Sequence, residues 1–370
     1  MEGHWAPSFS RVRELFAEEL SGGNACGLAL GIVVGGRTVV HLWGGYRDAA
    51  RTMPWMPDTL VCLFSASKPL VAVMVLKLIE QGLLELDQPV ARYWPEFAAG
   101  GKGNVSVRQV LAHLAGIPAT PDTNLESVYD RGALVRAVEQ QAPIWPPGSQ
   151  GCFHSFTYGV IAGELVRRVT GRPFGEVFRQ HLSRRFDGGF AFSLNQAEQC
   201  HCAEMILPAD NALLAMMCSP ETMLGRSWQP MPWQDLNTAA FRGCDFPSIA
   251  GQGSAVGLAR FHGMMANGGV MDGERVLDED LVNTALTEHW QQFDPFMGAP
   301  VRMGLGFMLS NPVFPFTGNP SSFAQPGLGG VVGLGDRDLR LGIGITPNLL
   351  SAGLQDPFLD QLIAVTLECL

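Results

Sequence analysis

The sequence contains little charge and very few lysines. Of its 370 residues only 16% are Asp, Glu, Lys or Arg, the formal net charge is −10, and the lysines are Lys68, Lys77 and Lys102. Nucleic acids and anionic membranes bind to basic protein surfaces. The composition therefore argues against both as partners. With 46% hydrophobic residues, the chain is instead long and apolar enough to bury a large core.

Targeting and metal-binding signals are also missing. No run is long and apolar enough to span a membrane, and the N-terminus lacks the basic and apolar regions of a secretory signal. The eight cysteines follow no regular spacing, which is typical of reduced thiols. We therefore expect a cytoplasmic protein. Cys200-His201-Cys202 resembles a metal-ligand run but lacks a second ligand pair, so we expect no metal and no other cofactor.

The motifs of the common α/β enzymes do not occur. G-x-S-x-G, the Walker loop and G-x-G-x-x-G are absent, and strands do not alternate regularly with helices. Instead, β-rich runs near both ends flank a helical middle, with a hairpin predicted over 27–43 and strands over 303–310, 331–334 and 341–346. We predict an α+β fold: a central antiparallel sheet flanked by helices from residues 1–75 and 250–370, a mostly helical domain over 76–249, and an active site in the cleft between them.

What the chain does contain is a serine three residues before a lysine in an apolar setting. Phe64-Ser65-Ala66-Ser67-Lys68 leads into an apolar helical run over 71–80. Residues i and i+3 share a helix face, and a desolvated lysine can lose its proton and activate a serine hydroxyl. Amides at the helix N-terminus favour negative charge on a reacting carbonyl oxygen. An N-cap serine beside a solvated lysine would give the same short motif, so the pair alone does not decide.

Further motifs make the whole chain resemble the serine β-lactamase-like family. This family groups class C β-lactamases, D-alanyl-D-alanine carboxypeptidases and the family VIII carboxylesterases. The resemblance runs from about residue 8 to 367 and is nearest to the esterase-like branch. It is carried by residues 64–68, 107–113, 147–148 with 153–155, 163–171, 258–261 with 266–269, and 325–327, and for the esterase-like branch by residues 43–45, 51–52, 92–95 and 129–130.

The resemblance implies a mechanism and a set of catalytic groups. Ser65 would attack an ester or amide carbonyl and form an acyl-enzyme, while Lys68 and a tyrosine would share the proton transfers. The backbone N–H groups of Ser65 and Leu328 would form the oxyanion hole. Tyr129 is the main candidate for the tyrosine, with Tyr158, one helical turn after Ser155, as a weaker one.

Two positions depart from the family pattern. Phe153 stands in place of the motif tyrosine, with Ser155 where an asparagine often lies, and Gln325-Pro326-Gly327 replaces Lys-Thr-Gly, His-x-Gly or Trp-Gly-Gly. Phenylalanine has no proton to transfer, and glutamine does not titrate near neutral pH. His154 is an alternative base. We expect Phe153, His154, Ser155, Gln325 and Gly327 to contact the substrate.

The sequence leaves three functions open. The first is hydrolysis of small-molecule esters or amides; the second is transfer of the acyl group to an alcohol or amine; the third is ligand binding without turnover. β-Lactam hydrolysis is disfavoured because the third motif lacks a basic residue for the substrate carboxylate. A hydrophobic or aromatic acyl or alcohol group is favoured by an apolar set of residues: Met216, Met217, Trp228, Trp233, Phe293, Phe296 and Met297.

Overall fold

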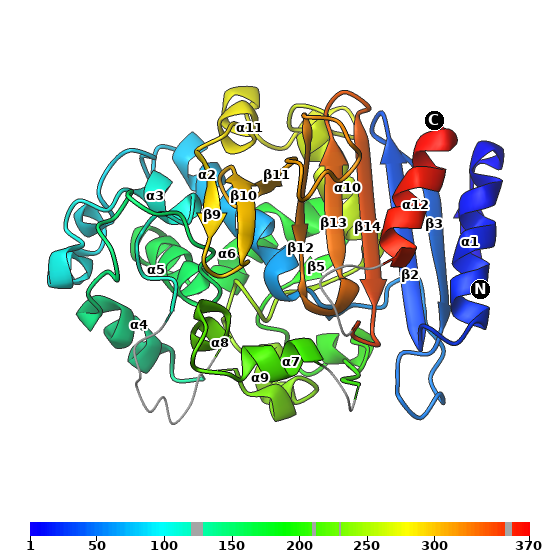
Figure 1. Cartoon of the computed structure of the whole chain (residues 1–370), viewed down its shortest axis with the longest axis horizontal. Coiled ribbons are helices and arrows are strands. Elements are labelled where there is room, and N and C mark those ends of the chain that lie inside the picture. Colours follow the sequence, from blue (N-terminus) through cyan, green and yellow to red (C-terminus); the bar gives the residue numbers. More distant parts are fainter. Residues whose placement is uncertain (120–128, 209–211, 229–230, 352–356) are drawn as a thin grey trace.

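The centre of the molecule is a large antiparallel sheet. The computed structural model describes residues 1–119, 129–208, 212–228, 231–351 and 357–370. Within them the largest sheet has nine strands (Figure 1), which are β1 (Glu2–Trp5), β2 (Gly27–Val34), β3 (Arg37–Gly45), β9 (Trp290–Asp294), β10 (Ala299–Met303), β11 (Met308–Leu309), β12 (Ser322–Pro326), β13 (Val332–Asp336) and β14 (Leu341–Pro347). Their order is β1-β3-β2-β14-β13-β12-β11-β10-β9. The pairing of β2 with β14 joins the two ends of the chain, which confirms the predicted sheet.

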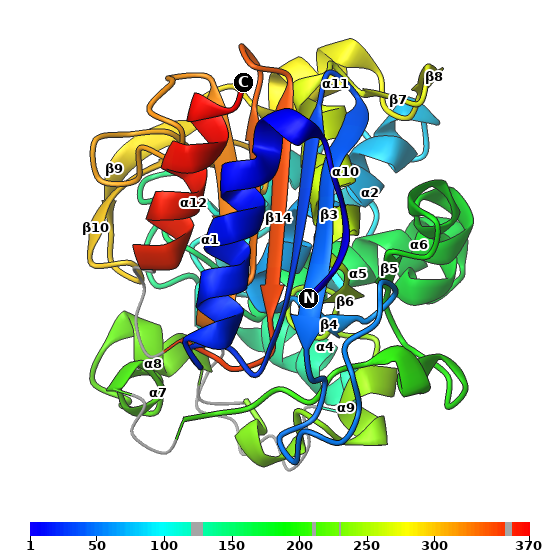
Figure 2. The same cartoon turned by 90° about the vertical axis from the view of Figure 1, so that its right-hand side faces the viewer.

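Helices cover both faces of this sheet. Figure 2 looks onto α1 (Ser10–Ser21) and α12 (Pro357–Glu368), which lie in front of it, while α10 (Ala255–Ala266) lies behind, against β2, β13 and β14. The close approach of α10 depends on glycine in β14, since a Cβ on Gly342 would lie 2.1 Å from the carbonyl oxygen of Ala259. The result is a three-layer arrangement with the sheet in the middle.

The remaining elements lie mostly beside the sheet. They comprise α2 (Lys68–Glu80), α3 (Val107–Leu111), α4 (Arg131–Gln140), α5 (Thr157–Thr170), α6 (Phe174–His181), α7 (Ala212–Met217), α8 (Met223–Trp228), α9 (Ala239–Gly243) and α11 (Glu279–Ala285), with the short strands β4 (Val61–Cys62), β5 (Phe190–Ala191), β6 (Gln252–Gly253), β7 (Val270–Met271) and β8 (Glu274–Arg275). Helix α2 is buried on almost every side and packs against α5, as expected of a helix that is apolar all round. Its N-terminus delivers Lys68 to the interior.

Most predicted elements are confirmed, but one strand is wrong. Residues 303–310 do not form a single strand, because β10 ends at Met303 and β11 begins only at Met308. The Gly304 N–H donates to the Phe307 carbonyl (2.8 Å), and Gly306 has a φ of +78°, so the chain reverses there. The division into two domains stays a prediction. In the described part of the chain, no helix has the length and apolarity needed to cross a membrane.

Candidate active site

Ser65 lies on a tight turn between β4 and α2. A 3₁₀ turn over Phe64–Ser67 runs directly into α2. Phe64 has a φ of +47°, which is unusual for a bulky residue and marks a backbone held in place by its surroundings. Two bonds hold it: the Leu63 N–H donates to the Gly251 carbonyl (2.8 Å), and the Ser67 hydroxyl donates to the Phe64 carbonyl. The nucleophile candidate is therefore fixed by the backbone on both sides.

Lys68 lies within hydrogen-bonding distance of the Ser65 hydroxyl. Its Nζ is 3.1 Å from Ser65 Oγ, and it donates to the Ser248 carbonyl oxygen at 3.2 Å. The side chain is completely buried, and this burial holds the pKa of Lys68 well below its ordinary value. In its neutral form the amine has a lone pair that can accept the serine proton. The predicted serine–lysine pair is thus close enough for a proton transfer, and burial favours the neutral amine.

An aromatic stack covers this lysine. The ring centroid of Phe153 is 4.6 Å from Lys68 Nζ. The stack continues from Phe153 to His113, with ring centroids 4.8 Å apart, and from His113 to Tyr158, with ring centroids 4.6 Å apart. A ring face near an ammonium group stabilises its positive charge. Phe153 can therefore stabilise a protonated Lys68, although it has no proton to exchange.

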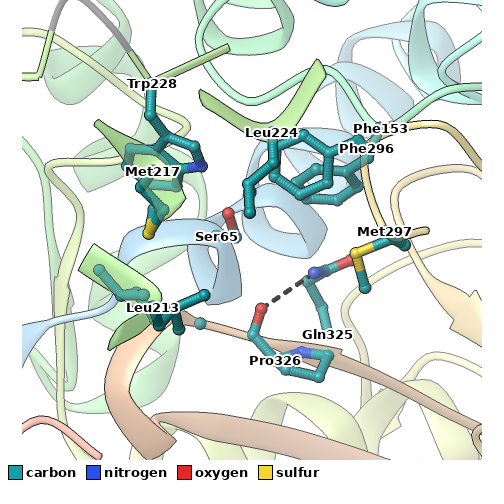
Figure 3. A pocket seen from close by; sticks show the side chains of 12 residues that line it. Ser65, Phe153, Leu213, Met217, Leu224, Trp228, Phe296, Met297, Gln325 and Pro326 are labelled. Carbon is teal, nitrogen blue, oxygen red and sulfur yellow. Dashed lines mark hydrogen bonds between the residues drawn. The ribbon is translucent and has the colours of Figure 1, made fainter. Parts of the chain in front are cut away.

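A pocket opens in front of Ser65. Figure 3 shows the side chains gathered around the serine, and the lining consists of Ser65, Phe153, Leu213, Met217, Leu224, Trp228, Phe296, Met297, Gln325, Pro326, Gly327 and Leu328. None of these described lining residues is charged. The prediction of an apolar pocket holds for Met217, Trp228, Phe296 and Met297. Met216 and Phe293 are instead exposed, and Trp233 stacks on Trp228 but does not line the pocket.

The end of strand β12 forms the opposite wall of the pocket. Gly327 lies so close to the Ser65 turn that a Cβ would be 2.3 Å from the Leu63 carbonyl oxygen. The Gly327 N–H donates to the Val331 carbonyl (2.7 Å), and Leu328 follows at the pocket surface. Gln325 is buried, and its Nε2 donates to the Pro326 carbonyl at 3.0 Å. This wall brings a backbone segment and a neutral amide, but no cation, to the pocket.

Comparisons with known proteins identify the family of the chain. The family model described as Beta-lactamase matches residues 12–368. The chain belongs to the beta-lactamase family. It is 31% identical over 359 residues to the esterase/beta-lactamase LipL of Mycobacterium tuberculosis, covering 93% of this chain and 82% of that protein.

Two solved structures of the beta-lactamase fold are similar over the full length of this chain. One is a family VIII carboxylesterase, with 32% identity, a TM-score of 0.89 and coverage of 100% of this chain and 99% of the other. The second is a penicillin-binding-protein homologue from Caulobacter crescentus, with 30% identity, a TM-score of 0.90 and the same coverage. These matches confirm the resemblance and the fold class inferred from the sequence motifs.

Because this member of the beta-lactamase family lacks the motif tyrosine, the nearby histidines matter. His154 Nδ1 donates to the Cys152 carbonyl (2.6 Å), and its Nε2 accepts from the Ile117 N–H (3.2 Å). Burial lowers the pKa of His154 to about 4. His113 Nδ1 accepts from the His154 N–H (3.0 Å), and burial lowers its pKa well below the ordinary value. Both rings are therefore neutral near pH 7, and both form hydrogen bonds with backbone groups. His154 does not line the pocket.

The candidate hydroxyl groups also lie outside the lining. Tyr129 donates to Asp235 Oδ2 at 2.8 Å, and its catalytic role stays a prediction. Tyr158 and Ser155 are completely buried, and neither hydroxyl has a hydrogen-bond partner among the described residues. Burial raises the pKa of Tyr158, so its phenol keeps its proton. The contact of His154 and Ser155 with substrate likewise remains a prediction.

Sequence reasoning missed Asp294, which shapes the pocket, and the lining residues Leu213 and Leu224. Asp294 Oδ2 accepts from the Phe153 N–H (3.0 Å), and its Oδ1 accepts from the Phe296 N–H (2.8 Å). The carboxyl group is fully buried, and this burial raises its pKa to about 6. Asp294 thus fixes two aromatic lining residues relative to each other. The one available signal was an acid between Phe293 and Pro295-Phe296, an apolar run in which charge is unexpected.

Proposed function

We propose that the protein hydrolyses small-molecule carboxylic esters or amides through an acyl-enzyme on Ser65, with Lys68 as the general base. The observation that carries this proposal is the 3.1 Å approach of the fully buried Lys68 Nζ to Ser65 Oγ. Its lowered pKa favours the neutral amine at physiological pH. Membership of the beta-lactamase family supports the same reaction class.

In the proposed acylation step, each proton and each charge has a nearby group to receive it. Lys68 removes the Ser65 proton as Oγ attacks the carbonyl carbon, and the resulting ammonium is held by the Ser248 carbonyl and the Phe153 ring. The N–H groups of Ser65 and Leu328 would receive the negative charge on the carbonyl oxygen. Lys68 then protonates the leaving group, which leaves the acyl group on Ser65.

The pocket favours uncharged substrates with an apolar or aromatic group. Its described lining is formed largely by Leu, Met, Phe and Trp side chains and carries no cation. A carboxylate-bearing substrate would lose its hydration there without gaining a charge partner. This supports esters or amides of neutral, apolar acids over β-lactams.

Acyl transfer to an acceptor other than water is the second candidate, and the observation that favours it is Phe153. A phenyl ring lies over Lys68, and the described pocket lining has no second titratable group to activate water, so the acyl-enzyme would persist until an acceptor arrived. If the acyl-enzyme did not form at all, the pocket would serve only to bind a ligand, which is the third alternative.

Covalent labelling tests the proposal. We expect a fluorophosphonate or an activated ester of an apolar acid to add one acyl or phosphonyl mass to Ser65, located by mass spectrometry of peptides. Ser65→Ala should carry no label, while Ser21→Ala, which changes an exposed serine at the end of α1, keeps the nucleophile and serves as the matched control. Absence of label on the wild type would contradict the enzyme mechanism and favour ligand binding.

A further inference from the structure

The Gln325 side chain presents an unused hydrogen-bond acceptor. Gln325 is 2% exposed, and its Nε2 donates to the Pro326 carbonyl oxygen at 3.0 Å. This bond fixes the orientation of the amide, because the reverse orientation would set two oxygens against each other. Its Oε1 is buried and has no partner among the described residues. A buried acceptor without a partner costs stability unless something that binds supplies a donor.

This acceptor lies on the side of β12 that meets the nucleophile. Side chains alternate along an extended strand, so residues 325 and 327 point to the same face. Gly327 faces the Ser65 turn, with its missing Cβ directed at the Leu63 carbonyl, and both Gln325 and Ser65 line the pocket. In Figure 3 the Gln325 amide lies beside Met297, across the pocket from Trp228. An acyl group on Ser65 would thus be attacked in a space that Gln325 also lines, and Oε1 is a side-chain acceptor there without a partner among the described residues.

We propose that Gln325 Oε1 accepts a hydrogen bond from the nucleophile that discharges the Ser65 acyl-enzyme, and so selects nucleophiles with two hydrogens on the attacking atom. This inference rests on the proposed function. Water and primary amines have two such hydrogens, whereas alcohols and secondary amines have one. Since the described pocket lining is apolar, the acceptor class it fits beside water is a primary amine with an apolar substituent.

The need for two hydrogens on the attacking atom follows from the proton transfers that discharge the acyl-enzyme. The amine nitrogen attacks the acyl carbon, the new C–N bond forms, and the C–Oγ bond to Ser65 breaks. One N–H proton passes to neutral Lys68 and from there to Ser65 Oγ, which restores both groups. The second N–H stays on nitrogen and donates to Gln325 Oε1. A secondary amine or an alcohol gives its single hydrogen to Lys68 and leaves Gln325 without a partner.

Partition of the acyl-enzyme between matched acceptors tests this selection. The enzyme is acylated with the p-nitrophenyl ester of an apolar acid, and the p-nitrophenolate burst counts the acyl-enzyme formed. Benzylamine and N-methylbenzylamine then compete, with each amide measured per acyl-enzyme by mass spectrometry. We expect Gln325→Met to lower the primary-to-secondary product ratio at least fivefold. Intrinsic reactivity and size cancel because the same two amines are used with both enzymes.

The control and the contrary outcomes are distinct. Gln291→Met changes the same residue type at an exposed position of β9 and should leave the ratio unchanged. An equal ratio in wild type and Gln325→Met would overturn the inference, whereas a wild type without a burst would overturn the proposed function instead. If Gln325→Met forms no acyl-enzyme, Gln325→Leu replaces it. A wild-type ratio equal to that of the uncatalysed reaction would then also overturn the inference.

Discussion

The two walls of the pocket are equipped very differently. On the α2 wall, Ser65 and Lys68 are hydrogen-bonded to each other, and burial lowers the pKa of the lysine. We call Phe153, whose ring lies over Lys68, and Gln325, at the end of β12, the facing wall. Phe153 has no proton to exchange, and Gln325 is neutral at any physiological pH. In the proposed mechanism, acylation uses the first wall, while discharge by water draws on both. The difference therefore predicts that the two halves of the reaction are separable, and that variants on each wall affect different steps.

The largest effect is expected on the α2 wall. Lys68→Met keeps the apolar volume but removes the base, so the acylation rate should fall on the order of 10³-fold. In the wild type, the acylation rate should rise as the pH passes the lowered pKa of Lys68, because the neutral amine is the base. The rate should level off at a pH well below the ordinary pKa of lysine. Stopped-flow release of p-nitrophenolate measures both quantities.

Lys77→Met is the matched control for this variant. Lys77 lies on the same helix but pairs with Glu80 near the surface. The acylation rate of this variant should therefore stay within about twofold of the wild-type rate. An acylation rate that survives in Lys68→Met would assign the base to another group and remove the contrast between the walls.

A variant of the facing wall should have a smaller effect, a faster hydrolysis of the acyl-enzyme. Phe153→Tyr places a hydroxyl near Lys68 and should speed hydrolysis of the acyl-enzyme by on the order of 10²-fold, while the burst changes little. The decay of the acyl-enzyme mass with time gives this rate. Tyr158→Phe removes the phenol on the other side of His113 and should leave the decay unchanged. The opposite result would mean that Tyr158 already supplies the missing proton transfer.

The residues of the α2 wall were easier to predict from the sequence than those of the facing wall, for a physical reason. Ser65 and Lys68 are three residues apart, and helical geometry alone brings them together. The hairpin of β2 and β3 is equally local, since Gly35-Gly36 makes its turn. Asp294 contacts Phe153 across 141 residues of sequence, and no local pattern encodes that bond. The strand β12 could be placed against the serine turn only through the resemblance.

The segment over 196–251 was the least predictable part for a related reason. Its helices α7, α8 and α9 have five or six residues each, too short to show a helical period. Composition correctly indicated apolar lining from this region. It could not indicate which of two adjacent methionines faces the pocket, because in one short turn the direction of a side chain depends on packing against the rest of the fold.

That pair of methionines provides the smallest and most local test. Met217 is buried at the pocket surface, whereas Met216, its neighbour on α7, is 54% exposed. Met217→Ala should lower kcat/KM for an ester with an aromatic acyl group roughly fivefold, with less effect on an acetyl ester, because apolar contact with the larger group is lost. Met216→Ala should change neither. Equal effects of both variants would mean that the acyl group lies elsewhere, since this comparison holds residue type and helix constant and changes only the direction of the side chain.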